Sequence, residues 1–332
     1  MPESMTCGDG QTVLHGGTVR HDRPGMTVSG PLPSGTLEGD PIVIKHEQFA
    51  GLQQMGITHL AQGQHRITVE TKTGLRANIP FMVDPYRTIE LRIAADATAI
   101  HPPNFIEWAD TVVMVARAMG TPTAMTYRSS VFAHSRSVMI VARLETGWPA
   151  PCVIAADEVR SMRTKVGPGV PDKVRISANQ IFVQSASMKA LMDTPDLPIG
   201  QAAIDLIAAL KPHTLPVITE VNSSALADAI QQIAVAESAS NAPRHDKENT
   251  AVEISMGPNG LKLKTRVASV VLPAKEGATL EPLIVPMSTL RVLAHIADWG
   301  DTAQIVKWAL DSQKEKIIFR CGRCSFIFAA RK

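Results

Sequence analysis

The sequence predicts an α+β fold made of repeated domains, each with two helices packed on antiparallel sheets. Three observations lead to this prediction. A proline–strand–helix pattern occurs three times, a second helix precedes the later two copies, and residues that alternate between apolar and polar follow the helices. The chain has 332 residues, which is long enough for two or three domains with separate cores.

The repeated pattern starts with a proline and a short apolar run, and continues with apolar residues at helical spacing. Its three copies lie at 41–55, 151–166 and 282–299. Pairs at matching offsets from the proline predict the buried face of each helix: Phe49 and Leu52, Val159 and Met162, Leu290 and Leu293. Strands and hairpins are expected after these helices, at 65–81, 173–187 and 303–330.

A further helix is predicted ahead of the two later copies, at 104–119 and at 224–238. Residues 126–145 are then typical of two strands, and 250–272 of a strand, a turn and a strand. Before Pro41 the sequence has only short β-like pieces and no helical pattern. The N-terminal third therefore holds the second half of the repeated unit.

This repeat predicts three domains, of which the first is shortened. Stretches rich in glycine, proline or polar residues mark the expected joints. The domain ranges that we expect are 1–97, 98–212 and 213–332.

Composition limits the class of protein. Hydrophobic residues make up 45% of the chain, charged residues 19%, and the net charge is +2. A protein that binds nucleic acid over its whole surface is usually more basic, so any contact with DNA is expected to use a local basic face. The N-terminus lacks the pattern of a secretion signal, no apolar run is long enough to span a bilayer, and four cysteines are too few for a disulfide scaffold. We expect a cytoplasmic protein.

The C-terminal stretch "FRCGRCSF" places Cys321 and Cys324 on the two sides of a two-residue turn. Gly322 can adopt the positive φ that a type II′ hairpin turn requires. A structural zinc ion needs about four ligands. The remaining cysteines, Cys7 and Cys152, are isolated in the sequence. We therefore expect a hairpin and no metal, although a small metal-dependent enzyme that uses this cysteine pair is an alternative.

Signals for catalysis are weak throughout the chain. The sequence contains no phosphate-binding loop, no His-Glu-x-x-His and no Gly-x-Ser-x-Gly, and its histidines have no ligand-like spacing. We expect no catalytic residues and no cofactor, and we do not expect an enzyme.

Several stretches of 216–332 resemble the DNA sliding clamps, most closely the bacterial β type. These stretches are "VITEVNSSALADAIQQI", "EGATLEPLIVPMSTLRVLAHI" and "KEKIIFRCGRCSFIFAAR". The resemblance is weaker over 98–200, and it covers only the second half of 1–97. It implies clamp-type domains whose helices line a central hole and whose sheets form an outer wall.

The family resemblance also implies a function and partners. Duplex DNA passes through the hole without being read in sequence, and the ring tethers a replicative polymerase to it. The polymerase and the clamp loader bind through short peptide motifs. A homodimeric ring is expected for the β type, and a trimer is the alternative. No membrane partner is expected.

A clamp needs a mildly positive bore, because strong phosphate contacts would stop it from sliding. Apolar residues on the predicted helices leave basic ones on the opposite face. The residues expected to line the bore are Arg117, Arg160, Arg163, Lys165, Arg291 and His295. Each of them is equally compatible with an ordinary solvated surface.

The resemblance further implies a shallow apolar pocket for partner peptides. By position, its residues are Arg136, Val138, Met139, Pro216, Val217, Phe328, Ala329 and Ala330. Ordinary core packing is the alternative for the apolar members. The sequence has "FAHSRS" where the family usually has Thr-Asp-Gly-His-Arg, and "AARK" in place of a Met-Pro-Met tail.

A second function remains open at this point. Repeated strands and helices are also typical of a β-rich structural or assembly protein, such as a virion component or an oligomeric interaction module that does not encircle DNA.

Overall fold

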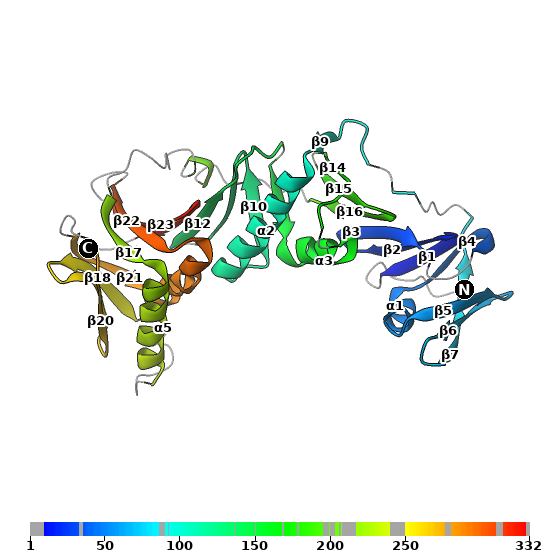
Figure 1. Ribbon diagram of the computed structural model, residues 1–332, viewed down its shortest axis with the longest axis horizontal. Coiled ribbons are helices and arrows are strands. Elements are labelled where there is room, and N and C mark those ends of the chain that lie inside the picture. Colours follow the sequence, from blue (N-terminus) through cyan, green and yellow to red (C-terminus); the bar gives the residue numbers. More distant parts are fainter. Residues whose placement is uncertain are drawn as a thin grey trace. The chain divides into compact units, whose positions relative to one another are not determined.

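The computed structural model confirms an α+β fold built on antiparallel sheets (Figure 1). It describes residues 10–32, 36–85, 90–91, 93–135, 137–149, 151–167, 169–177, 179–194, 199, 203–205, 207, 217–239, 250–275, 280–309 and 315–329. The contacts divide the chain into two compact units. The first contains Met1–Ala109 and Asp157–Leu197, and the second contains Asp110–Ala156 and Pro198–Lys332.

The first unit holds a nine-stranded sheet with the order β8-β4-β1-β2-β3-β16-β15-β14-β9. Five strands come from the N-terminal third: β1 (Gln11–Gly16), β2 (Thr18–Arg23), β3 (Met26–Pro31), β4 (Leu37–Lys45) and β8 (Met82–Val83). Four come from the middle of the chain: β9 (Thr98–Ile100), β14 (Lys173–Ile176), β15 (Gln180–Ser185) and β16 (Met188–Asp193).

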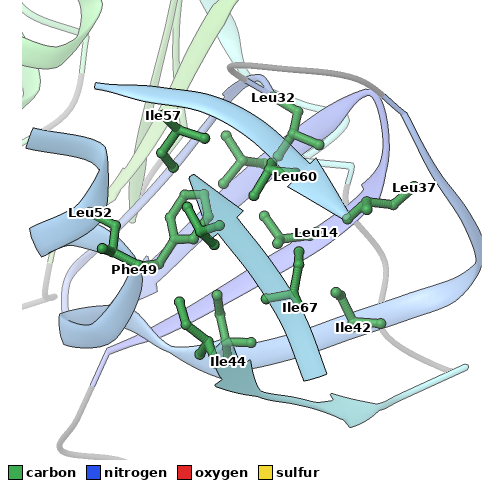
Figure 2. Close-up of a cluster of buried hydrophobic side chains, with 13 residues drawn as sticks. Leu14, Leu32, Leu37, Ile42, Ile44, Phe49, Leu52, Ile57, Leu60 and Ile67 are labelled. Atoms are coloured by element: carbon green, nitrogen blue, oxygen red, sulfur yellow. The ribbon is translucent and has the colours of Figure 1, made fainter. Parts of the chain in front are cut away.

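A three-stranded sheet and helix α1 (His46–Gln54) complete the N-terminal part of this unit. The strands are β5 (Ile57–Gln62), β6 (Arg66–Thr71) and β7 (Arg76–Pro80). Figure 2 shows the core that they share with the large sheet, where Phe49 and Leu52 of α1 pack with Leu14 and Ile67. Phe49 and Leu52 are the buried hydrophobic residues of α1, as the repeat predicts.

The second unit holds an eight-stranded sheet with the order β13-β10-β11-β12-β24-β23-β22-β17. Its strands from the middle of the chain are β10 (Thr123–Tyr127), β11 (Ser130–His134), β12 (Val138–Arg143) and β13 (Cys152–Ala155). Those from the C-terminal third are β17 (Val217–Asn222), β22 (Thr302–Ala309), β23 (Glu315–Cys321) and β24 (Cys324–Ala329).

A four-stranded sheet with the order β20-β19-β18-β21 lies in the same unit. Its strands are β18 (Ala251–Gly257), β19 (Gly260–Lys264), β20 (Ser269–Leu272) and β21 (Leu280–Pro286). Helix α5 (Ser223–Ala239) packs against the helical segment formed by α7 (Met287–Leu290) and η1 (Arg291–Trp299). Leu290, Leu293 and Ile296 are fully buried, as their spacing predicts.

Two more helices come from the middle of the chain. Helix α2 (Pro102–Met119) buries Phe105, Ala109, Val112 and Ala116, and the division between the units falls after Ala109. Helix α3 (Ala156–Val166) belongs to the first unit from Asp157 onwards. It has acidic residues in its first turn and basic residues in its last, which complements the helix dipole.

Sheet topology shows the repeat more clearly than the sequence does. In the middle of the chain, β9 pairs with β14 of the meander β14-β15-β16, and β13 pairs with β10 of the meander β10-β11-β12. In the C-terminal third, β17 pairs with β22 and β21 pairs with β18 in the same way. Both thirds therefore use one order: strand, helix, three strands, strand, helix, three strands.

The N-terminal third contains most of this order. The meander β1-β2-β3, strand β4, helix α1 and the meander β5-β6-β7 match the last eight elements of the complete copies. The described residues contain no counterpart of the first strand and first helix. The sequence predicts only the second half of the unit in this third, whereas the structure shows that the short β-like pieces before Pro41 form a regular meander. The shortened first domain remains a prediction.

The large sheets join neighbouring thirds by the same kind of strand pair. Strand β3 pairs antiparallel with β16, and β12 pairs antiparallel with β24. In both joints the last strand of a first meander meets the last strand of the next third's second meander. This continuity explains why the contacts cluster into two units, since the middle of the chain is shared between two sheets. The three domain ranges remain a prediction.

Two elements differ from the expectation. Residues 126–145 hold the end of β10 and two full strands, because Arg128 takes a positive φ of 51° and turns the chain after Tyr127. The segment 282–299 has one α-helical turn, and then continues as a 3-10 helix to Trp299. Three residues per turn still place Leu290, Leu293 and Ile296 on one face.

The hairpin at the C-terminus is confirmed. Cys321 and Cys324 are register partners at the ends of β23 and β24, and both are buried free thiols. Gly322 has φ +52°, whereas Arg323 is not among the residues with positive φ. A single positive φ at the first turn position fits type II′.

Candidate functional site

Helix α3 carries three of the cations expected in a bore, and Arg160 is the most exposed of them. Its Nη1 atom lies 2.9 Å from Oδ1 of Asp157, one turn earlier, and both side chains are exposed. An exposed pair of this kind contributes little to stability. Val159, Met162 and Val166 form the buried face of the helix, as predicted.

The two other cations of α3 are less exposed than the helical pattern suggests. Arg163 is half-buried and lines a small cavity together with Phe105 and Val183. Lys165 is also half-buried, and its pKa is lowered by burial and by the positive charge of Arg23. Tertiary neighbours cover these side chains, and the periodicity of one helix cannot reveal them.

The second unit holds the remaining three residues of the predicted bore. Arg117 is exposed in the last turn of α2, and Arg291 is exposed at the start of η1. His295 is half-buried, with Nδ1 3.5 Å from Oδ2 of Asp298. That these residues and α3 face one channel remains a prediction.

Among the residues predicted for a peptide pocket, the structure brings Val138 and Phe328 together. They are register partners on β12 and β24, and both are buried. Met139 points to the opposite face of the sheet, where it packs with Ile318 and Ile327. The residues predicted for the pocket therefore do not share one side of the sheet.

The other predicted pocket residues are less well placed by the structure. Val217 begins β17 with 43% of its surface exposed. Ala329 ends β24, opposite Lys316. Arg136, Pro216 and Ala330 lie outside the described residues.

A shallow hollow of about 420 Å³ lies elsewhere in the second unit, over the four-stranded sheet. Thr250, Glu253, Lys264, Arg266 and Ile284 are among the residues that line it. None of the residues predicted for the peptide pocket belongs to it. Its lining mixes both charges with exposed aliphatic groups, which does not select one ligand chemistry.

Sequence reasoning missed a polar cluster in the first unit. The hydroxyl oxygen of Thr12 lies 2.8 Å from Nδ1 of His21 and 3.2 Å from Nδ1 of His46, and the two Nδ1 atoms are 3.2 Å apart. Burial and the neighbouring His46 lower the pKa of His21 to about 4. These residues come from β1, β2 and α1, so no local spacing could have revealed their contact.

The described residues contain no group of three His, Cys, Asp or Glu side chains that could hold a metal ion. They also include no helix with the length and apolar character needed to cross a membrane.

Comparisons by sequence give no match. No protein-family model matches it, and no curated protein matches it.

Comparison with solved structures gives a different result. The β subunit of DNA polymerase III from Pseudomonas aeruginosa is similar with a TM-score of 0.69 and 12% identity, over 99% of this chain and 94% of that one. A putative β subunit from Eubacterium rectale has a TM-score of 0.70 and 7% identity, over 100% and 93% of the two chains. The β subunit from Streptococcus pyogenes has 0.69 and 13%, over 99% and 93%. This chain thus has the fold of the bacterial DNA polymerase III β sliding clamps.

Proposed function

We propose that this protein is a sliding clamp, a ring that encircles duplex DNA and tethers a replicative polymerase to it. The observation that carries the proposal is the near-complete overlap with β clamps, which spans 99% or more of this chain in each comparison given above. A clamp acts by topology and needs no reacting groups. We place this function in the cytoplasm, without a cofactor.

The joints inside the chain support the proposed ring closure. The last strand of each first meander, β3 or β12, pairs with the last strand of the next third's second meander, β16 or β24. Among the described strands, the same rule leaves β20 without this partner in the C-terminal third and β7 without one in the N-terminal third. We propose that β20 pairs antiparallel with β7 of a second copy, which closes a homodimer with two such joints.

Exposure along these strands supports this pairing. Strand β12 is almost fully buried. In contrast, β20 exposes Ser269 and Val271, and β7 exposes Arg76, Asn78 and Pro80. An open edge strand with exposed apolar groups is a template for another strand. A trimer would use the same two edges with a different angle between copies.

The bore of this ring would carry few cations, on α2, α3 and η1. Helices α1 and α5 contribute glutamines and no Lys or Arg. We propose that Arg117, Arg160, Arg163, Lys165, Arg291 and His295 contact phosphates weakly and without reading sequence. Weak contacts suit a ring that must slide.

Partner proteins are proposed to dock through short peptides near the C-terminus of β24. The proposed set is Arg136, Val138, Met139, Pro216, Val217, Phe328, Ala329 and Ala330. Of the apolar residues in this set whose side chains are described, Val217 is the exposed one. A polymerase and a clamp loader are the partners.

The test is retention on DNA of different topology. The protein is loaded on nicked circular DNA with a clamp loader, and the DNA is then washed at high salt, with and without linearisation. A ring stays on the circle and is lost from the cut molecule, because only a free end lets it slide off.

Equal retention on both forms would contradict encirclement. If the protein also forms regular assemblies without DNA, the alternative of a β-rich assembly protein is favoured.

A further inference from the structure

Two cationic side chains in the first unit, Arg23 and Lys165, interact electrostatically, and neither forms an ion pair with a described residue. Among the described residues, no carboxylate is within ion-pair distance of Arg23 or Lys165. The Nε atom of Arg23 is buried and has no hydrogen-bond partner there. A partly buried cation that has no carboxylate within ion-pair distance is costly, which favours an anion at this place.

Backbone packing brings Arg23 next to His46. Gly10 lies between them, and a Cβ atom placed on it would be 3.5 Å from Cβ of Arg23 and 3.3 Å from Cβ of His46. The amide of His46 also donates a hydrogen bond of 2.8 Å to the carbonyl oxygen of Gly10. The side chains of Arg23 and His46 therefore start side by side.

Helix α3 supplies Lys165 from the other side. At its start, the carboxylate of Glu158 touches the β2–β3 turn so closely that a Cβ on Gly25 would overlap it. Lys165 is two turns further along the same face. Its charge lowers the pKa of both His21 and His46, and Arg23 lowers the pKa of Lys165, so the four groups interact electrostatically.

Carboxylates also surround these four residues. Asp22 favours a charged His21, but it is bonded to Arg20, whose Nε lies 2.7 Å from Oδ1. Glu47 favours a charged His46. The pKa of Glu158 is raised by burial, and the charge of Arg23 opposes that rise. The facing groups that carry or accept charge are Asp22, Glu47, Glu158, Asp193 and the side chain of Gln53.

We propose that Arg23, His21, His46 and Lys165, named here the Arg23–Lys165 cluster, bind a phosphate group and that the two histidines take up protons when it is filled. Phosphate binding and histidine protonation support each other for a physical reason. A phosphate gives Arg23 and Lys165 the close ion pair that the described carboxylates do not provide. The same charge offsets the repulsion that keeps His21 and His46 neutral, so that filling the site and protonating the histidines favour each other.

The phosphate can come from the backbone of duplex DNA, an origin that rests on the proposed function, or from a free phosphate ion. Both present the same chemistry to the cluster. The experiment therefore uses inorganic phosphate and a short blunt-ended duplex in separate titrations of the full chain, observed through the imidazole NMR signals of His21 and His46.

Binding of either probe is expected to shift these signals and to raise the pH at which His46 titrates. Affinity for the duplex, whose phosphodiesters keep one charge throughout, is expected to increase by about threefold or more between about pH 7.5 and about pH 5.5, because a proton is taken up on binding. Arg23→Gln and Lys165→Gln should each abolish the shift. Lys173→Gln, which removes an exposed lysine on β14 of the same unit, should leave it unchanged.

A response to the duplex alone assigns the site to nucleic acid, and a response to phosphate alone assigns it to a free ion. If neither probe shifts the histidine signals, or if Arg23→Gln and Lys165→Gln respond like the wild type, the proposal is wrong. Circular dichroism verifies that these variants fold. The titrations do not require a ring. Their result can therefore be interpreted even if the protein is not retained on circular DNA.

Discussion

At the scale of single residues, the contact between His21 and His46 couples stability to pH. His21 is 8% exposed, and its pKa is lowered from 6.5 to about 4 by burial first and by His46 second. The unfolded chain therefore binds a proton more readily than the folded one between these two values. Stability is highest above about pH 6.5, and it falls as the pH drops through this window.

We expect the low pKa of His21 to decrease the free energy of unfolding by about 3 kcal/mol as the pH falls from 6.5 to 4. One pKa unit corresponds to about 1.4 kcal/mol. Urea unfolding across this range measures the slope. His21→Gln should flatten it, whereas His59→Gln, at an exposed position on β5, should keep it. A His21→Gln protein with the wild-type slope would contradict this assignment.

Gly322 is constrained twice, by its backbone and by its surroundings. Its φ is +52°, and a Cβ atom there would overlap with the carbonyl oxygen of Trp299 at the end of η1. We expect Gly322→Ala to lower the free energy of unfolding by about 2 kcal/mol. Gly257→Ala is the control, since a Cβ there meets open space. Chemical denaturation compares them, and equal losses would show that the turn is not constrained.

At the scale of elements, the open edges of the sheets differ in character. Strand β5 occupies the position at which β14 and β22 receive a partner strand in the complete copies. Its pairing with β6 shifts register between Ile57 and His59, and a bulge of this kind discourages the addition of a further strand. Strand β20 pairs with β19 without such a shift and exposes Val271.

The edge of β20 is the element whose change should alter assembly. We expect Val271→Asp to turn the proposed dimer into a folded monomer, because a carboxylate would be buried in the proposed joint. Val170→Asp is the matched control at another exposed valine. Analytical ultracentrifugation measures the mass of each. A Val271→Asp protein that stays dimeric would place the joint elsewhere.

At the scale of the whole molecule, the proposed function separates weak phosphate contacts from ring topology. Linear DNA would be held only by charge, so its affinity would depend on salt. Circular DNA would be held by the proposed ring itself. The near-neutral net charge of +2 and the few cations on the helices agree with a protein that relies on topology.

We expect the double variant Arg160→Gln and Arg291→Gln to weaken binding to linear duplex and to reduce its salt slope by about 2. Its lifetime on circular DNA should not change. Fluorescence anisotropy on linear duplex and gel filtration of loaded circles measure the two effects. Arg66→Gln, on strand β6, is the control with the wild-type slope. Loss of the circular complex in the double variant would show that charge, rather than closure, holds the DNA.

The sequence by itself determined the elements and much of their order. The spacing of Phe49 and Leu52, or of Val159 and Met162, depends only on local helical geometry, which a sequence records directly. The hairpin at Gly322 was also predictable, because two-residue turns restrict the residues that can form them.

Only the tertiary structure decided how the thirds join and which charged groups meet. The pairs β3–β16 and β12–β24 join segments that lie far apart in the chain, and hydrogen bonds between backbones carry no sequence signature. The exposure of Arg163 and the contact of His21 with His46 likewise depend on neighbours from other elements. Local sequence patterns indicate on which face of a helix or strand a residue lies. Packing between elements that are distant in the sequence determines which other residues that face contacts.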